Sequence, residues 1–195
     1  MTPQEIAWLQ RCRSITEYLS ALDTHEWAFE PVGGRGKLTT ETGLELTIRQ
    51  GQRITVHAWF GDMGQFAPRK ITDHGYGWVS FCITEDGRKD DLVIARAILR
   101  RLLPRYRVAF AETSVRYAAH LEREAWEQET REAICKTFTG ATRVSQGETV
   151  YLRGGKASVS ATHGVHLDLH GLSRDQALYI LSYLQETRNQ RHTPQ

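Results

Sequence analysis

The sequence lacks the segments that would place the chain in a membrane or outside the cell. No uncharged apolar run in its 195 residues approaches the roughly 20 residues that a membrane-spanning helix needs. Residues 1–5 lack the basic and apolar segments of a signal peptide. Proline and glycine, at 5 and 16 residues, are close to average usage, which excludes collagen-like and low-complexity chains. We therefore expect a cytoplasmic globular protein.

Cysteine is scarce and its spacing excludes two kinds of stabilised small protein. Cys12, Cys82 and Cys135 are odd in number and more than fifty residues apart. This pattern is typical of reduced thiols in a core and excludes both a disulfide framework and a Cys-x-x-Cys metal site. A chain of this length buries enough surface to fold without a metal or a disulfide. We also expect no cofactor.

Strong net charge is also missing. The formal net charge is +2 with 40% hydrophobic residues, whereas intrinsic disorder needs low hydrophobicity and high net charge. A dedicated DNA-binding domain usually carries a larger positive excess. Of the 25 basic residues, however, 20 are arginine and only 5 are lysine. The excess of arginine indicates either biased coding or a surface that uses guanidinium chemistry.

The first half of the chain predicts a helix, three strands and a second helix. Thr2 and Glu5 have capping-box spacing around Pro3, so a helix begins there and ends near Asp23. Residues 31–37 contain three glycines and indicate a loop. A helix follows Gly87 until Pro104 interrupts it. Between them, alternation predicts three antiparallel strands, with apolar residues Leu44, Leu46 and Ile48, then Ile54, Val56, Ala58 and Phe60, then Val79, Phe81 and Ile83.

The second half predicts the same order of elements. A long helix over 113–138 is expected to turn Val115, Ala118, Leu121, Ala125 and Trp126 inward, with acidic and basic residues paired along its outer face. A Gly154-Gly155 turn joins the first two of three strands. The apolar residues of this second set of elements are Val150 and Leu152, then Ala157, Val159 and Ala161, then Val165, Leu167 and Leu169, and in the last helix Ala177, Leu178, Leu181 and Leu184.

The fold class is therefore α+β, with two α-β-β-β-α units whose antiparallel sheets are covered on one face by helices. The expected units are residues 1–104 and 105–188, followed by a frayed tail at 189–195. Arg49 and Gly51 match Arg153 and Gly155 at a constant offset, which is consistent with a tandem duplication packed as one body. The alternative is two unrelated halves.

Basic residues gather along the helix that begins after Gly87. Five arginines and no acid lie between Arg96 and Arg107. Each guanidinium can make a bidentate contact with phosphate or carboxylate, although an ordinary solvated helix face would look the same. We call this set the Arg ridge, and its members are Lys89, Arg96, Arg100, Arg101, Arg105 and Arg107.

The polar faces of the predicted strands carry a second set of candidate residues. In the first half these are Arg49, Trp59 and Trp78, beside His57, and in the second half Tyr151 and Arg153. Exposed tryptophan on a sheet indicates something that covers it. The cover could be a nucleobase, the aromatic hot spot of a partner protein, or the other half of this chain.

A histidine cluster supports a third interpretation. His166, Asp168 and His170 share one face of a predicted strand, with His163 just before it, and two imidazoles with a carboxylate can bind zinc. The alternative is the polar side of an amphipathic strand. Because the outer two residues of such a triplet lie about 13 Å apart, the second interpretation is favoured and no metal is expected.

We therefore expect a binding protein rather than an enzyme. It would engage a protein or nucleoprotein partner through the Arg ridge and the sheet aromatics, as an accessory or inhibitor protein of a bacterial mobile element, and it could form a homodimer. One alternative is a nucleic-acid-binding protein whose Arg ridge contacts phosphates. The other is a metal-dependent hydrolase at the histidine cluster.

Overall fold

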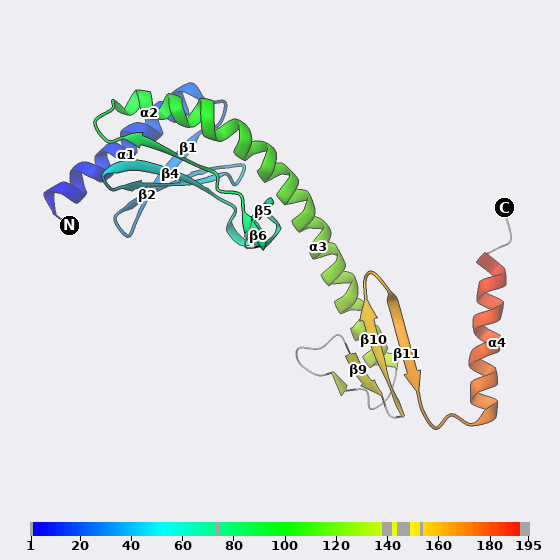
Figure 1. Ribbon diagram of the computed structural model, residues 1–195. Coiled ribbons are helices and arrows are strands. Elements are labelled where there is room, and N and C mark those ends of the chain that lie inside the picture. The colour runs from blue at the N-terminus through cyan, green and yellow to red at the C-terminus, as the bar shows by residue number, and fades with distance from the viewer. Residues whose placement is uncertain (1, 73–74, 138–141, 144–148, 153, 192–195) are drawn as a thin grey trace. The chain divides into compact units, whose positions relative to one another are not determined.

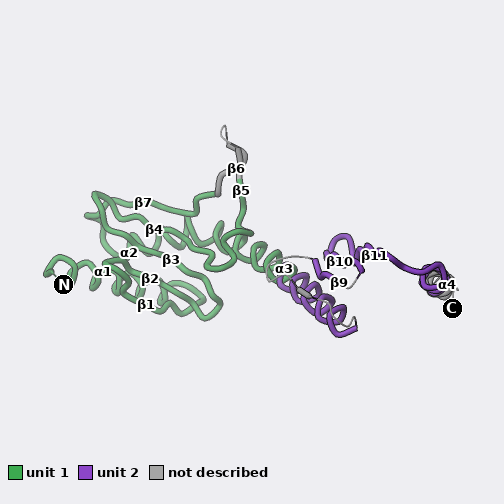
Figure 2. Tube along the Cα trace, turned by 90° about the horizontal axis from the view of Figure 1, so that it is seen from below, with its two compact units in different colours: residues 1–119 green, residues 120–195 purple. Residues whose placement is uncertain are grey.

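The computed structural model describes residues 2–72, 75–137, 142–143, 149–152 and 154–191 (Figure 1). By the distribution of contacts the chain forms two compact units, Met1–Ala119 and His120–Gln195, coloured separately in Figure 2. The α+β class is confirmed. The division expected at residue 104 stays a prediction.

Unit 1 contains the elements up to the first half of a long helix, in the order α1 (Pro3–Leu22), β1 (Trp27–Val32), β2 (Arg35–Thr40), β3 (Glu45–Gln50), β4 (Arg53–Trp59), η1 (Gly61–Phe66), β5 (Arg69–Thr72), β6 (Gly75–Trp78), β7 (Cys82–Asp86), α2 (Asp91–Ala97), η2 (Ile98–Leu102) and α3 (Leu103–Thr137). Unit 2 takes the second half of α3, then β8 (Thr142–Arg143), β9 (Thr149–Leu152), β10 (Gly155–Ser160), β11 (Gly164–Leu169) and α4 (Arg174–Arg191).

The start of α1 confirms the capping box. The Thr2 hydroxyl accepts the Glu5 amide hydrogen, and the Glu5 carboxylate accepts that of Thr2 at 2.6 Å. Pro3 stands at the first helical position, where its missing N–H costs nothing. The helix ends at Asp23, as the sequence predicts.

The sheet of unit 1 has five antiparallel strands in the order β1-β2-β3-β4-β7, not three. The prediction of a loop at 31–37 is wrong, because this segment forms the hairpin between β1 and β2. Gly33 and Gly34 both have positive φ, at 53° and 74°, which the two-residue turn of a hairpin requires. The last strand begins at Cys82 rather than Val79, and β5 and β6 form a separate two-stranded sheet.

Helices cover one face of this sheet, as expected, and build the core of unit 1 there (Figure 1). Cys12 of α1 is fully buried, and a Cβ added to Gly36 of β2 would lie only 2.9 Å from its Sγ. This absence of a side chain on Gly36 lets the helix approach the sheet closely. The largest fully buried side chains of this core are Ile15, Leu19, Leu38, Leu46, Ile48, Ile54, Val56, Ile94, Ile98, Leu103 and Tyr106.

Pro104 does not interrupt the second helix, contrary to the sequence prediction. The chain stays helical from Asp91 to Thr137, with a π-helical turn at Ile98–Leu102 directly before the proline. A proline has no N–H to donate, and its ring collides with the carbonyl one turn earlier in a regular α-helix. The wider π turn moves that carbonyl, so the helix continues.

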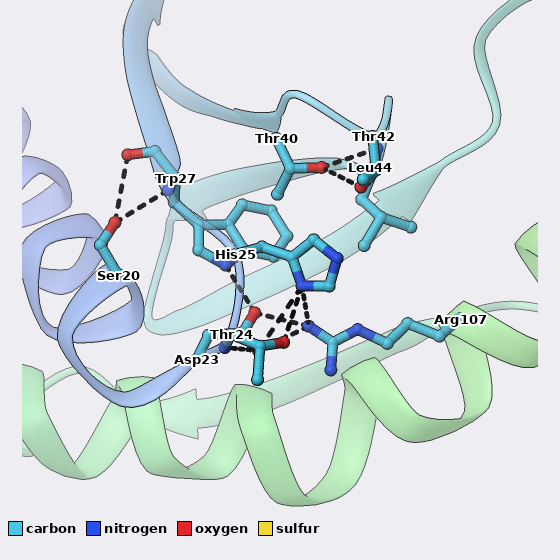
Figure 3. Close-up of polar contacts among 9 residues, drawn as sticks. All are labelled: Ser20, Asp23, Thr24, His25, Trp27, Thr40, Thr42, Leu44 and Arg107. Carbon is cyan, nitrogen blue, oxygen red and sulfur yellow. Dashed lines mark hydrogen bonds and ion pairs between the residues drawn. The ribbon is translucent and has the colours of Figure 1, made fainter.

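Asp23 joins three elements of unit 1 (Figure 3). Both of its carboxylate oxygens accept from Nη2 of Arg107 in α3 at 2.6 Å, and Oδ2 also accepts from the indole N–H of Trp27 in β1 at 2.8 Å. Its side chain is only 3% exposed. The end of α1, the start of β1 and the first turns of α3 are therefore held at one carboxylate.

Unit 2 is built around a smaller antiparallel sheet, ordered β11-β10-β9 with the two-residue β8 beside β9. β9 and β10 form the expected hairpin, and Gly154 has a φ of +95° between them, but Gly155 is already the first residue of β10 and pairs with Leu152. Val150, Leu152, Ala157 and Val159 are buried, and Ile134 and Cys135 of α3 pack against the first three.

Several apolar residues expected in the core of the second half are exposed instead. In α3 these are Val115, Ala118, Leu121, Ala125 and Trp126, in β11 Val165 and Leu167, and in α4 Leu178 and Leu181, while the side chain of Leu184 lies outside the described residues. Alternation and helical spacing predicted which residues share a face, but the described part of the chain does not bury these faces. Two of the expected ion pairs are present on α3, Glu112–Arg116 and Glu127–Arg131.

The structure gives no evidence for the duplication. Unit 1 has a five-stranded sheet and a separate two-stranded hairpin, whereas unit 2 has a smaller sheet. α4 runs to Arg191, and Phe138 and residues 192–195 lie outside the described part of the chain. Among the helices that are described, none is long and apolar enough to cross a membrane.

Candidate functional site

The face of the five-stranded sheet opposite the helices is polar, and its central row is defined by strand register. Lys37, Thr47, His57 and Cys82 stand in line on β2, β3, β4 and β7. The flanking rows carry Arg49 and Trp59, because side chains two residues apart on a strand share a face. Two candidates from the sequence therefore lie on the same surface.

A hollow of about 460 Å³ lies over this face. Its floor is formed by β3 and β4, and its walls by η1 with the residue that follows it and by the segment that precedes β7. Its volume lies within the range of small-ligand sites. We call it the sheet pocket, and it is lined by Thr47, Arg49, His57, Ala58, Trp59, Phe60, Gly61, Gly64, Ala67, Val79, Ser80 and Phe81.

Aromatic side chains fix the apolar wall of the sheet pocket. Phe60 makes edge contacts with Phe81 and Tyr106, with ring centroids 5.6 and 5.3 Å apart, and stacks with Phe110 of α3. The Tyr106 hydroxyl donates to the Trp59 carbonyl and accepts from the Glu45 amide N–H at 3.0 Å. Burial raises the pKa of Tyr106 to about 12, so the hydroxyl keeps its proton and its role as donor.

α3 also holds the outer wall. Phe66 of η1 packs against Tyr117, with ring centroids 5.7 Å apart, and the Ser114 hydroxyl contacts the sulfur of Met63 at 3.5 Å. Both helix residues belong to unit 1. The wall is therefore part of the folded unit rather than a loose loop.

The electrostatics of the sheet pocket depend on Arg49 and His57. Burial lowers the pKa of His57 below its usual range, and the positive charge of Arg49 lowers it further. The imidazole is therefore neutral at pH 7. Arg49 is exposed and has no side-chain partner in the described part of the chain, so its guanidinium is available to a ligand.

The sheet pocket has no assembled nucleophile. Cys82 stands opposite His57 in the register, but its sulfur accepts a hydrogen bond from Ser80 at 3.3 Å. No hydrogen bond joins that sulfur to the imidazole within the described residues. This arrangement fits binding better than nucleophilic catalysis.

The Arg ridge divides into residues with different roles. Glu85 of β7, only 4% exposed, accepts from Lys89 and from Arg101, each at 2.5 Å. Arg107 binds Asp23, and the guanidinium of Arg105 lies 6.0 Å from the ring centroid of Phe81. Lys89, Arg101 and Arg107 therefore form ion pairs within unit 1, whereas Arg105 has only this ring contact among the described residues.

Arg96 and Arg100 are the members of the ridge left for a partner. Both are exposed on α2 and η2, and neither has an ion pair or hydrogen bond within the described part of the chain. Two cations make a much smaller phosphate-binding surface than the six expected from the sequence.

The remaining candidates from the sheet faces are Tyr151, Arg153 and Trp78. Tyr151 is exposed on β9 of unit 2. Arg153 and the side chain of Trp78 lie outside the described residues.

The histidine cluster is not a metal site in the part of the chain that the structure describes. Asp168 lies 3.6 Å from Nε2 of His170 and 3.7 Å from Nζ of Lys156, while His166 pairs with Ser158 across the strands. No three His, Cys, Asp or Glu side chains among the described residues are placed to hold one ion.

The sequence did not identify Phe60, Phe81 and Glu85 as site-forming residues. For Glu85 a signal was present, because it follows Phe81 and Ile83 at alternate positions on the strand face that turns inward. A carboxylate on an inward face needs cations, and Lys89 in the turn before α2 and Arg101 of η2 supply them. Comparison with known proteins adds nothing to this assignment, since no family model, curated protein or solved structure matches the chain.

Proposed function

We propose that this chain is a non-enzymatic binding protein that engages a protein or nucleoprotein partner through the outer face of its five-stranded sheet. The observation that carries the proposal is Trp59, 59% exposed at a preformed hollow that contains an unpaired arginine. Tryptophan and arginine are the side chains most enriched in binding hot spots. Burial of a tryptophan this exposed would contribute a large part of the binding energy.

The test compares two tryptophan substitutions. The tagged wild-type chain, Trp59→Ala and Trp126→Ala are used to capture partners from native host cells, with and without nuclease. Trp126 is a matched control because it is also exposed, at 42%, and lies in unit 2. We expect a partner that withstands nuclease and is retained by the wild-type chain and Trp126→Ala but lost from Trp59→Ala.

Titration of the purified partner into each variant then measures how much affinity the substitution removes. Loss of a hot-spot tryptophan costs about 2 kcal/mol or more, which is roughly a thirtyfold weaker affinity. Equal affinity of the wild-type chain and Trp59→Ala would contradict the proposal.

A second candidate function is nucleic-acid binding, and the observation that favours it is the free pair Arg96 and Arg100. If these residues contact phosphates, the double substitution to alanine lowers the salt dependence of binding by about two counterions. Arg53→Ala is the control, since Arg53 is also exposed but lies on β4. Binding that is insensitive to salt would favour the protein partner. Loss of the partner after nuclease treatment would favour nucleic acid.

A further inference from the structure

We infer that the sheet pocket accepts an apolar, preferably aromatic, residue that carries a carboxylate, as the C-terminal residue of a partner polypeptide does. The inference rests on the proposed function and adds the chemistry of the group that the partner inserts. Three properties of the pocket support it: the size and apolar lining, the single positive charge and the rigidity of the walls.

The size and lining suit one large side chain. About 460 Å³ is at the small end of ligand sites and accommodates one aromatic residue with its backbone. Phe60, Phe81, Val79 and Trp59 are among the lining residues, and three of these four are aromatic. Such rings favour edge-to-face and stacked contacts with another ring.

The pocket has one positive charge, which a ligand with one negative group would complement. Arg49 is the only Lys or Arg among the twelve lining residues, and none of the twelve is Asp or Glu. The nearby Lys37 and Glu45 neutralise each other at 3.0 Å. A guanidinium forms two parallel hydrogen bonds with one carboxylate.

A phosphate chain fits this charge less well. Nucleic-acid backbones carry many charges and are bound by several cations along a groove. The sheet pocket offers a single cation within a mainly apolar hollow. A polypeptide carboxylate matches both features.

The rigidity of the pocket favours recognition of one defined group. Tyr106 holds the backbone at Trp59 and Glu45 from behind, and α3 fixes η1 through Phe66 and Tyr117. Because these walls are in place before binding, little conformational entropy is lost when the group enters.

The experiment uses two small probes that differ only in charge, N-acetyl-L-phenylalanine and N-acetyl-L-phenylalaninamide. Each is titrated into the full chain and followed by two-dimensional NMR. We expect the acid to bind about fivefold or more tightly than the amide, with shifts centred on β3, β4 and η1. Arg49→Gln should abolish this preference, and Arg53→Gln, on the same face of the sheet, should preserve it.

The ring of His57 gives an independent readout. A carboxylate bound beside Arg49 favours the charged imidazolium, so the acid should raise the pKa of His57 while the amide leaves it unchanged. A substitution that only disturbed the fold would not produce this selective change.

Three results would overturn the inference: no binding of either probe at millimolar concentration, equal binding of both, or a preference for the acid that survives in Arg49→Gln. Tighter binding of adenosine monophosphate than of the acid would also overturn it and favour nucleic acid. If the partner is lost from Trp59→Ala while the probes fail, the carboxylate assignment alone is wrong. If the probes behave as expected but Trp59→Ala binds the partner as tightly as the wild-type chain does, the pocket binds carboxylates and the proposed function is wrong.

Discussion

Asp23→Asn tests how unit 1 is held together, because one carboxylate there joins α1, β1 and α3. Asparagine keeps the size of the side chain but removes the negative charge that Arg107 and Trp27 contact. Hydrogen bonds to a charged group contribute about 1.5–3 kcal/mol, against roughly 0.5–1.5 kcal/mol for neutral ones. Arg107 is 34% exposed, so water replaces part of the lost interaction. We expect the free energy of unfolding to fall by about 2 kcal/mol at pH 7.

The same substitution has a defined pH dependence. Burial alone would raise the pKa of Asp23, but hydrogen bonds from Arg107, Trp27 and the Thr24 amide outweigh it and hold the pKa below its ordinary value of 3.8. Because the folded pKa is lower than the unfolded one, the carboxylate stabilises the fold fully at pH values above 3.8. This contribution is lost as the pH falls through the folded pKa. The difference between wild-type and Asp23→Asn should therefore be constant near neutrality and shrink in acid.

Urea unfolding followed by the NMR signals of β3 and β4 measures this difference, since these strands report unit 1 separately from unit 2. Asp62→Asn is the control, because Asp62 is an exposed carboxylate on η1 with no hydrogen bond or ion pair among the described residues. It should change the stability by less than about 0.5 kcal/mol. A similarly small effect of Asp23→Asn, or an effect that does not change between pH 7 and strongly acidic solution, would refute the reasoning.

Two further predictions concern a buried hydroxyl and a close backbone approach. Tyr106→Phe leaves the part-buried Trp59 carbonyl and Glu45 N–H without their side-chain partner, so the free energy of unfolding of unit 1 in urea should fall by about 1–3 kcal/mol. A smaller loss would mean that water takes the place of the hydroxyl. Gly155→Ala places a Cβ 2.3 Å from the Asp168 carbonyl oxygen, which the strands can relieve only by moving apart. We expect hydrogen exchange to accelerate in β10 and β11 but not in β3, and unchanged protection of β11 would contradict the close approach.

Local signals predicted the elements that depend on local interactions. The capping box of α1 and the paired strands β3 and β4 follow from short-range spacing and alternation, and all three are present. β1 and β2 were missed because Pro31 and three glycines outweighed their apolar residues. The useful signal was the Gly33-Gly34 pair between two short runs, since two glycines suit a tight hairpin turn, and a proline is tolerated on an edge strand such as β1.

Non-local effects explain the other differences. Pro104 predicts a helix end by itself, and only the π turn before it, which has no sequence signature that we recognise, lets the helix continue. Val165 and Leu167 alternate as core residues should, yet alternation cannot show whether enough partner surface exists to bury them. Pattern therefore predicts which face is apolar, whereas burial depends on what the rest of the chain supplies.

The candidate site was predicted in part. Arg49 and Trp59 were named from the polar side of their strands, and both lie at the sheet pocket. The Arg ridge stays a predicted binding surface, but three of its cations form ion pairs, Lys89 and Arg101 with Glu85 and Arg107 with Asp23 at the end of α1. One-dimensional charge counting cannot detect such pairing, since a free cation and a paired one look alike in sequence.

The close packing of Cys12 against Gly36 makes this thiol a built-in reporter of unfolding. Burial raises the pKa of Cys12 to about 12, so almost none of it is the reactive thiolate at neutral pH. An alkylating reagent has no room beside Gly36, whereas Cys82 is exposed on the same unit. The rate at which a thiol reagent modifies Cys12, relative to Cys82, would thus measure how often unit 1 opens, without any label introduced into the chain.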